Sequence, residues 1–331
     1  MSNPSPHVSP PPADRPIRIG ISACLLGHEV RFDGQHKRND FLCDTLGGHV
    51  EWVPVCPEVE LGLGIPRDTL RLVAGPRGPD LVVQRTGRAL TEEMNAFSAE
   101  RVRQLVDEDL SGYVLKKDSP SCGLLRVKVY AGVEKGVTAT RDGHGLFAAA
   151  LVAQFPDLPI EEEGRLNDPR LRENFIERVF AYHRLKQLFA GRWTLGQLVQ
   201  FHSAHKLTLL AHTTRGYQEL GRLVAVGKTM PRATLGQRYR SGFMAALAQL
   251  ATVGRHVNVL QHIAGYFREQ LDPADRHELE GVIEDFRRGL VPLIVPITLV
   301  RHHARRLGIE YILGQVYLEP HPKELKLRNH V

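Results

Sequence analysis

The chain has 331 residues, which is more than one hydrophobic core usually spans, so two domains are expected. Of its residues 42% are hydrophobic and 24% are charged, a balance typical of a soluble globular protein. Its longest apolar stretch, residues 289–300, contains two prolines and is too short to span a bilayer, so we expect no membrane contact. Four scattered cysteines without an export signal argue against a disulfide framework and predict a cytoplasmic protein.

The net charge of +6 is unevenly distributed along the chain. Residues 1–160 hold 18 Lys and Arg against 20 Asp and Glu, whereas residues 161–331 hold 25 against 17. The basic second half suggests an anionic partner such as a nucleotide, RNA or DNA. An ordinary solvated surface also carries a surplus of this size, so both interpretations stay open at this point.

The first half alternates between strand and helix patterns after a start rich in Pro and Ser. Residues 1–16 predict a disordered tail. Strands are predicted at residues 17–23, 49–55, 112–116 and 158–160, a hairpin at 70–73 and 81–84, and helices at 35–46, 91–110 and 145–155. The alternation predicts an α/β domain over residues 17–160, built on a Rossmann-like parallel sheet.

The second half shows helical patterns and no convincing strand. Helices are predicted at residues 169–188, 195–225, 234–250, 256–271, 273–289 and 297–307. Residues 311–331 are expected to be extended. The sequence therefore predicts an all-helical domain over residues 161–331.

Three of the four cysteines, Cys24, Cys56 and Cys122, each follow a short apolar run and precede a turn or breaker residue. Because ligands bind beyond the carboxyl ends of the strands in open parallel sheets, we expect these thiols to converge. Their gaps of 32 and 66 residues lack the close pairs of structural zinc sites, so an iron–sulfur cluster with one open iron fits better. A zinc site and three separate buried cysteines remain alternatives. Cys43 is expected to pack as a small hydrophobic residue.

Polar residues accompany two of these cysteines. Glu58, two residues after Cys56, is a candidate general acid or base beside the metal. Ser119 and Ser121 precede Cys122, and their hydroxyls can orient a substrate or hold the turn. The turn role is the favoured interpretation for Ser121.

Four motifs follow one another in the first half: Ser22-Ala-Cys-Leu-Leu-Gly, Val30-Arg-Phe-Asp-Gly, Pro54-Val-Cys-Pro-Glu and Leu115-Lys-Lys-Asp-Ser-Pro-Ser-Cys-Gly. Together they resemble the thiouracil desulfidase family over about residues 17–160. Three motifs stand in the second half: Phe201-His-Ser-Ala-His-Lys, Asn258-Val-Leu-Gln-His-Ile-Ala-Gly-Tyr-Phe and Val291-Pro-Leu. They are similar to a helical domain of unassigned function that is often fused to that family.

The resemblance implies a [4Fe-4S] cluster and a set of site residues. The implied cluster ligands are Cys24, Cys56 and Cys122, the implied acid/base is Glu58, and the implied assisting serine is Ser119. Candidate substrate contacts in the same motifs are Ser22, Asp33 and Ser121. A glycine pair that often follows the glutamate motif is replaced here by Glu60-Leu-Gly-Leu-Gly, which bears on loop shape and substrate choice.

The sequence thus predicts a [4Fe-4S]-dependent, non-redox desulfidase that converts a thiolated uracil base or nucleotide, such as 4-thio-UMP or 2-thiouracil, to its oxo form with release of sulfide. A candidate RNA contact is expected through the basic helical domain, in keeping with the 4-thiouridine chemistry. The alternative is a nucleic-acid-binding protein in which an iron–sulfur or zinc site is structural.

Overall fold

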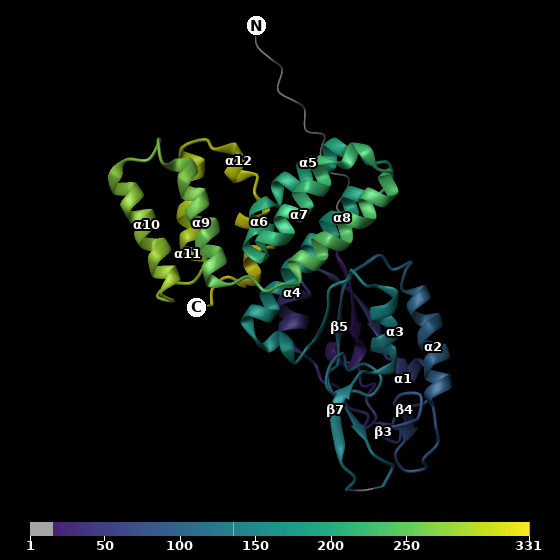
Figure 1. Ribbon diagram of the computed structural model, residues 1–331. Helices are drawn as coiled ribbons and strands as arrows, with labels where there is room; N and C mark the ends of the chain where they lie inside the picture. Colours follow the sequence, from purple (N-terminus) through teal and green to yellow (C-terminus); the bar gives the residue numbers. More distant parts are fainter. Residues whose placement is uncertain (1–15, 135, 331) are drawn as a thin grey trace.

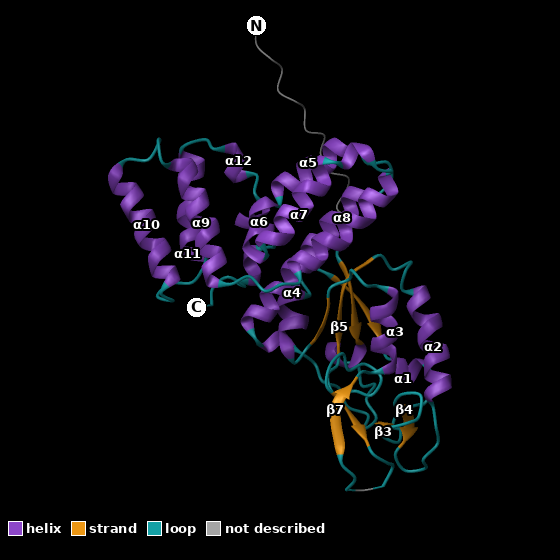
Figure 2. Cartoon of the chain, viewed as in Figure 1, coloured by secondary structure: helices purple, strands orange, loops and turns teal. Residues whose placement is uncertain are grey.

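The computed structural model describes residues 16–134 and 136–330. The tail predicted at residues 1–16 therefore lies outside the described residues, apart from Pro16. An α/β region is followed by a helical region, and the long helix α4 (Pro169–Phe189) lies between them (Figure 1). The strands belong to the first region, as Figure 2 shows. The predicted fold class is confirmed.

The first region is built on a parallel sheet of four strands. They are β1 (Arg18–Ser22), β2 (Glu51–Val55), β5 (Leu110–Leu115) and β8 (Ile160–Glu162), in the order β2-β1-β5-β8. Helices α2 (Thr91–Gln104) and α3 (Leu146–Gln154) pack on one face of this sheet, and α4 packs on the other. All strands run in the same direction, so their carboxyl ends meet at one edge.

The two central strands are apolar because both of their faces are buried. Ile19 and Ile21 of β1 pack against Phe175 of α4, whereas Tyr113 of β5 packs against Phe147 of α3. None of these side chains is exposed by more than 1%. The alternation fixes the register of the sheet, because a slip by one residue would exchange the two faces.

A smaller mixed sheet extends the first region. Its strands are β3 (Leu70–Val73), β4 (Asp80–Val83), β6 (Val127–Tyr130) and β7 (Ala139–Gly143), in the order β4-β3-β6-β7. The predicted hairpin forms as the antiparallel pair β3–β4. Strands β6 and β7 were not predicted, because β6 has only four residues and β7 is polar and exposed apart from Gly143.

Several short helical turns connect these elements. They are α1 (Pro57–Glu60), a π-helical turn at Phe41–Leu46, and 3-10 turns at Ala23–Leu26, Arg165–Asn167, Gly227–Thr229, Val316–Leu318 and Lys323–Leu325. The helix predicted over residues 35–46 is wrong for residues 35–39, which are mostly exposed and have no core to pack against. The tail predicted as extended contains two of the 3-10 turns.

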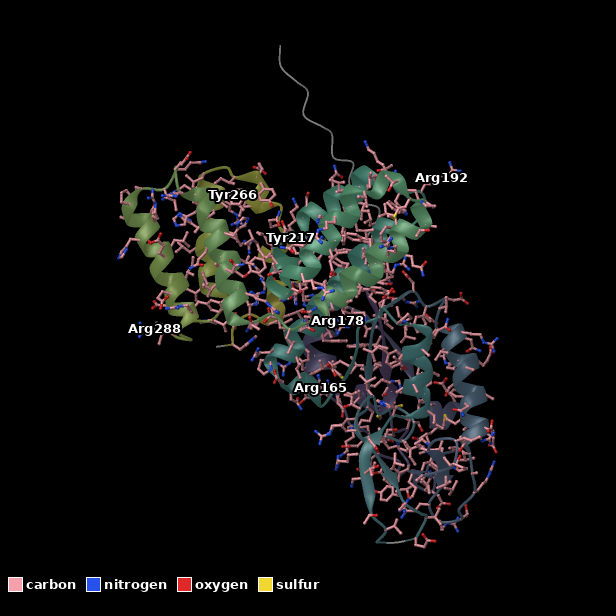
Figure 3. All side chains as sticks on the ribbon, viewed as in Figure 1. Arg165, Arg178, Arg192, Tyr217, Tyr266 and Arg288 are labelled. Carbon is pink, nitrogen blue, oxygen red and sulfur yellow. The ribbon has the colours of Figure 1, made fainter. Side chains whose placement is uncertain are left out.

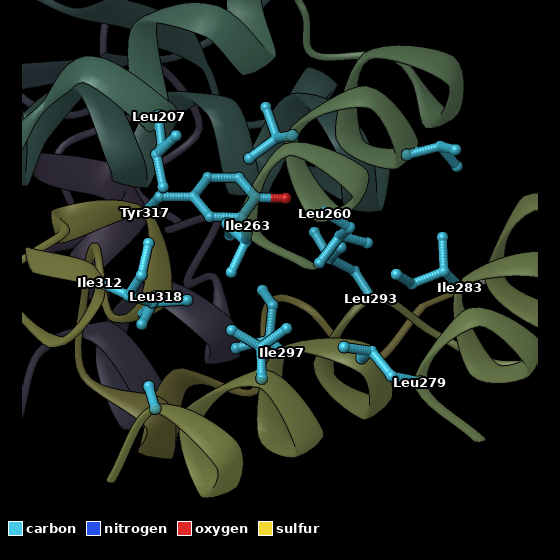
Figure 4. Close-up of a cluster of buried hydrophobic side chains, with 14 of the residues drawn as sticks. Leu207, Leu260, Ile263, Leu279, Ile283, Leu293, Ile297, Ile312, Tyr317 and Leu318 are labelled. Carbon is cyan, nitrogen blue, oxygen red and sulfur yellow. The ribbon is translucent and has the colours of Figure 1, made fainter. Parts of the chain in front are cut away.

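The second region consists of helices that enclose two cores. Beyond α4 they are α5 (Leu195–Ala204), α6 (Lys206–His212), α7 (Thr214–Ala225), α8 (Arg232–Leu247), α9 (Val253–Phe267), α10 (Pro273–Arg287), α11 (Ile294–Arg306) and α12 (Glu310–Leu313). The predicted span 195–225 forms three helices, since Thr213 caps α7 by accepting the N–H of Gly216. Figure 4 shows one core, which includes Leu260, Ile263, Ile283 and Ile297. Among the described residues, no helix has the length and apolar character needed to cross a membrane.

Helix α4 belongs to both regions. Phe175 and Val179 pack with the parallel sheet, whereas Leu185 packs with the helical core. Arg178 lies on α4 at the junction of the two regions (Figure 3). The C-terminal segment returns to the same place and buries Leu327 in the core of the parallel sheet. We propose that the two domains meet at residues 163–168, between β8 and α4, close to the expected division at residue 160.

A buried ion network fastens the C-terminal segment to α4. The side chain of Arg328 is 4% exposed and donates from Nε to Glu173 at 3.0 Å, while its Nη2 lies 3.8 Å from Glu177. Burial alone would raise the pKa of Glu177, but the hydrogen bond from His212 and the charge of Arg328 lower it below its ordinary value. The positive charge of Arg328 therefore offsets part of the cost of burying the carboxylates of Glu173 and Glu177.

Replacing Arg328 with methionine should destabilise the protein by about 3–5 kcal/mol, because it leaves buried carboxylates without their cationic partner. The control is Arg287→Met, which removes an exposed pair with Glu284 on α10 and should change the stability far less, because solvent screens the pair. Urea unfolding of the two variants measures the difference. Equal unfolding midpoints would show that the Arg328 network contributes no more than a surface pair.

Candidate active site

The site lies at the carboxyl ends of β1, β2 and β5. Cys24 follows β1 in the 3-10 turn Ala23–Leu26, Cys56 directly follows β2 and caps α1, and Cys122 stands in the loop after β5. All three cysteines line one cavity of about 360 Å³. The cavity also includes Glu58, Ser119 and Ser22 in its lining. The structure thus brings together most of the residues that the sequence singled out.

Cys24 and Cys122 are buried, Cys56 is half-buried, and the three thiols lie close enough to influence one another. Burial raises the pKa of Cys24 to about 11, opposed by the charge of Lys116 and reinforced by Cys56. Burial likewise raises the pKa of Cys56 and, most strongly, that of Cys122, where a hydrogen bond from Ser22 opposes the shift. Such thiols stay protonated by themselves, and a bound cationic group is what would draw their protons off.

The donors around the cavity bear on the kind of metal centre that it could hold. Within the described part of the chain, no three His, Cys, Asp or Glu side chains are grouped to hold a single metal ion. A zinc ion would need all its sulfur ligands at about 2.3 Å from one point. In a four-iron cluster each thiolate binds a different iron, so the ligands stand farther apart. The three thiols that line the cavity are soft donors of the kind that an iron–sulfur cluster takes.

Glu58 is held firmly at the wall of the cavity. Its Oε2 accepts N–H groups from Nε and Nη2 of Arg67 at 2.9 and 2.6 Å, and its Oε1 accepts the hydroxyl of Ser121 at 3.0 Å. The side chains of Glu58 and Arg67 are 15% and 6% exposed. A carboxylate fixed in this way beside three thiols can act on a ligand bound in the cavity.

The two serines before Cys122 have different surroundings. The hydroxyl oxygen of Ser119 accepts the backbone N–H groups of Ser121 and Cys122 at 3.2 and 3.1 Å, so Ser119 holds the turn while its own proton stays available to the cavity. Ser121 is fully buried and donates to Glu58. Ser119 therefore holds the turn, the role favoured above for Ser121. The hydroxyl of Ser121 points to Glu58 instead.

The other two candidate substrate contacts also differ. The hydroxyl of Ser22 accepts the backbone N–H of Lys116 at 3.0 Å and lines the cavity. Asp33 pairs with Arg31 at 3.3 Å and accepts the backbone N–H of Gln35. The lining of the cavity includes Arg31 but not Asp33 among the described residues. Asp33 therefore contacts a residue of the cavity wall, Arg31, without lining the cavity itself.

The cavity is predominantly basic. Its cationic lining residues are Arg31, Lys37, Arg67, Lys116 and Lys117, and its anionic ones are Glu58 and Asp118. Lys116 is paired with Glu163 at 2.5 Å. Arg67 lies outside the motifs quoted above, and a lone basic residue carries no signal of its partners in the sequence. This surplus of positive charge suits an anionic ligand.

Comparisons with known proteins divide the chain in the same way. The sequence pattern of 2-thiouracil desulfurase matches residues 19–163, and that of a protein of unknown function (DUF1722) matches residues 206–322. The uncharacterized protein YbgA of Escherichia coli (strain K12) is 33% identical over 165 residues, which are 50% of this chain and 98% of that protein. The uncharacterized protein YbbK of Bacillus subtilis (strain 168) is 29% identical over 155 residues, which are 45% of this chain and 98% of that protein.

One solved structure is also similar. It is the [4Fe-4S]-dependent thiouracil desulfidase TudS, which is 30% identical in sequence, with 46% of this chain and 94% of that chain covered and a TM-score of 0.38. The motifs, the cavity with its three cysteines and the family match all fall in residues 19–163. The chain belongs to the 2-thiouracil desulfurase family through this segment, and carries a DUF1722 domain after it.

Proposed function

We propose that the protein is a [4Fe-4S]-dependent desulfidase that replaces the sulfur of a thiolated uracil base or nucleotide with oxygen and releases sulfide. The observation that carries the proposal is the single cavity shared by Cys24, Cys56, Cys122 and Glu58. The family match and the 30% identity to a [4Fe-4S]-dependent thiouracil desulfidase support it.

The cluster would be held by the three cysteines and would supply a thiophilic Lewis acid, an iron without a protein ligand, to the sulfur of the substrate. Glu58 takes a proton from water as the water oxygen attacks the thiocarbonyl carbon, and returns a proton as sulfur departs. The balance is C=S plus water giving C=O plus hydrogen sulfide, with no net change in oxidation state. The proton of Ser119 is available to the same reacting atoms.

The charge of the cavity favours a substrate that carries a phosphate. Lys37 and Lys117 are exposed lining residues, and no ion pair of Lys37 occurs among the described residues. The cavity of about 360 Å³ is at the lower end of ligand pockets, roughly 300–1,000 Å³, and it would hold the cluster as well as the reacting part of the substrate. We expect the protein to convert 4-thio-UMP with a higher kcat/KM than free 4-thiouracil, and no preference for the nucleotide would contradict this.

The test of the function is made on anaerobically reconstituted full-length protein. Iron and acid-labile sulfide are measured, and sulfide release from 4-thio-UMP and 2-thiouracil is followed in the same sample. We expect about four iron and four sulfide per chain together with turnover. A loaded protein that releases no sulfide from either compound would overturn the proposal.

One observation favours the alternative of nucleic-acid binding. A surface pocket of the helical region is lined by Thr298, Arg301, His302, Arg305, Arg306 and Lys323. Arg301 and Arg306 are paired with Glu319 and Asp275, but Arg305 and Lys323 have no ion pair among the described residues. If this surface contacts RNA, the affinity for RNA should fall steeply as the salt concentration rises. A protein that only binds RNA would show this salt dependence and would release no sulfide.

A further inference from the structure

Arg67 is buried at the wall of the cavity, and four of the five N–H groups of its guanidinium donate hydrogen bonds. Nε and Nη2 donate to one oxygen of Glu58, and Nη1 donates to the backbone carbonyls of Val30 at 2.9 Å and Gly64 at 3.2 Å. The backbone N–H of Arg67 also donates to the carbonyl of Phe32 at 2.9 Å. An arginine with so many fixed partners cannot itself move toward a ligand.

The arrangement determines where the carboxylate of Glu58 points. Helix α1, which carries Glu58, has only four residues, and a free glutamate side chain would sample several rotamers. Arg67 fixes Oε2 and Ser121 fixes Oε1, from two different loops. The orientation of the carboxylate is therefore set by these partners and not by α1 itself.

The same guanidinium joins Glu58 to another segment of the cavity wall, residues 30–32. Val30 and Phe32 line the cavity together with the three cysteines. The thiol of Cys56 lies 3.7 Å from the carbonyl of Val30, which is the carbonyl that Arg67 holds. Arg67 thus links Glu58 to the backbone carbonyl that also contacts the thiol of Cys56.

We infer that Arg67 is the positioning residue of the desulfidase reaction, acting through Glu58; the inference rests on the function proposed above. A lysine at this position could not replace it, because a single ammonium group lacks the planar fork that reaches Glu58 and the Val30 carbonyl at once. A displacement of about 1 Å of a catalytic group can cost roughly 100-fold in rate. Loss of the fork should therefore lower kcat while the substrate still binds.

The experiment is a double-mutant cycle on the anaerobically reconstituted full chain. We compare kcat and KM with 4-thio-UMP, and the iron content, of four variants. They are Arg67→Lys, Arg67→Met, Glu58→Gln and the double variant Arg67→Met with Glu58→Gln. We expect Arg67→Lys to lose roughly 10- to 100-fold in kcat with KM changed by less than about threefold. The double variant should be no slower than Glu58→Gln alone, since Arg67 works through that residue.

Three further measurements separate positioning from a general structural role. Ser121→Ala, which removes the other anchor of Glu58, should give a smaller loss of kcat in the same direction with iron content unchanged. Arg85→Lys, at an exposed pair with Asp68, serves as the matched control and should behave as wild type. Binding of the oxo product UMP, measured by calorimetry, should change by less than about threefold in Arg67→Lys, because four of the five guanidinium N–H groups of Arg67 are committed to Glu58 and two backbone carbonyls.

The outcomes are distinguishable. Wild-type kcat in Arg67→Lys, fully multiplicative losses in the double variant, or a rise in the dissociation constant of UMP that matches the loss of activity would each overturn the role of Arg67. A wild-type protein that is loaded with iron but releases no sulfide would instead overturn the proposed function, and the inference with it.

Discussion

Replacing Cys24, Cys56 or Cys122 with alanine, one at a time, should abolish sulfide release and lower the iron content well below that of the wild type. Each thiol is the sulfur donor that its own loop brings to the cavity, so no neighbouring cysteine can take its place. A cluster that keeps only two protein thiolates loses both a ligand and the geometry that leaves a single iron open. Iron and acid-labile sulfide analysis with sulfide release from 4-thio-UMP measures both effects.

Cys43→Ala is the matched control for the three variants. Cys43 is half-buried, and its thiol donates to the carbonyl of Leu25 at 3.5 Å. It is not part of the cavity lining among the described residues. We expect full iron content and wild-type activity, with a loss of roughly 1 kcal/mol or less in stability for one small buried group. A Cys24, Cys56 or Cys122 variant with the iron content and rate of Cys43→Ala would contradict the ligand assignment.

Thermal unfolding of the cluster-free proteins separates a lost ligand from a lost fold. Without a cluster, each buried thiol packs as a small apolar group, so the alanine variants should unfold within a few degrees of the cluster-free wild type. Their defect should appear only after reconstitution. A variant that is already unfolded before reconstitution would be uninformative for the ligand role and would be replaced by the corresponding serine variant.

The position of the three cysteines could be predicted from sequence for a simple geometric reason. Each follows an apolar run, and the carboxyl ends of parallel strands lie along one edge of a sheet. That argument does not give the order of the strands. The three cysteines meet at one cavity because β1, β2 and β5 are neighbours in the sheet. The same pattern could not predict β7, which is polar and almost wholly exposed, because its strand state comes from pairing with β6.

The contacts of the polar residues could not be predicted in the same way. Ser119 and Ser121 are both hydroxyls beside a proline, and only the path of the loop decides that the second one reaches Glu58. Arg67 follows Glu58 by nine residues in an irregular segment, where no periodicity relates two side chains. Residue type and spacing therefore indicate the chemistry of the site, whereas the hydrogen bonds that orient it depend on tertiary structure.

Glu58→Gln should lower kcat by roughly 100- to 10,000-fold, the usual contribution of a general acid or base, and leave the iron content unchanged. Glutamine has nearly the volume of glutamate, and its amide oxygen can still accept from Arg67. It cannot take up or return a proton in the reaction. Because the substrate is held by other parts of the cavity, KM should change much less than kcat. The measurement is single-turnover and steady-state sulfide release from 4-thio-UMP.

The control is Glu92→Gln, at an exposed position in the first turn of α2, which should match the wild type in rate and iron content. The stability of Glu58→Gln should fall modestly, because the largely buried guanidinium of Arg67 loses its charged partner. Turnover within about threefold of the wild type would remove Glu58 from the chemistry. The same variant distinguishes the enzyme from a nucleic-acid-binding module. An enzyme should lose most of its rate while the cluster and the RNA affinity stay unchanged. A module that only binds does not require proton transfer at this carboxylate.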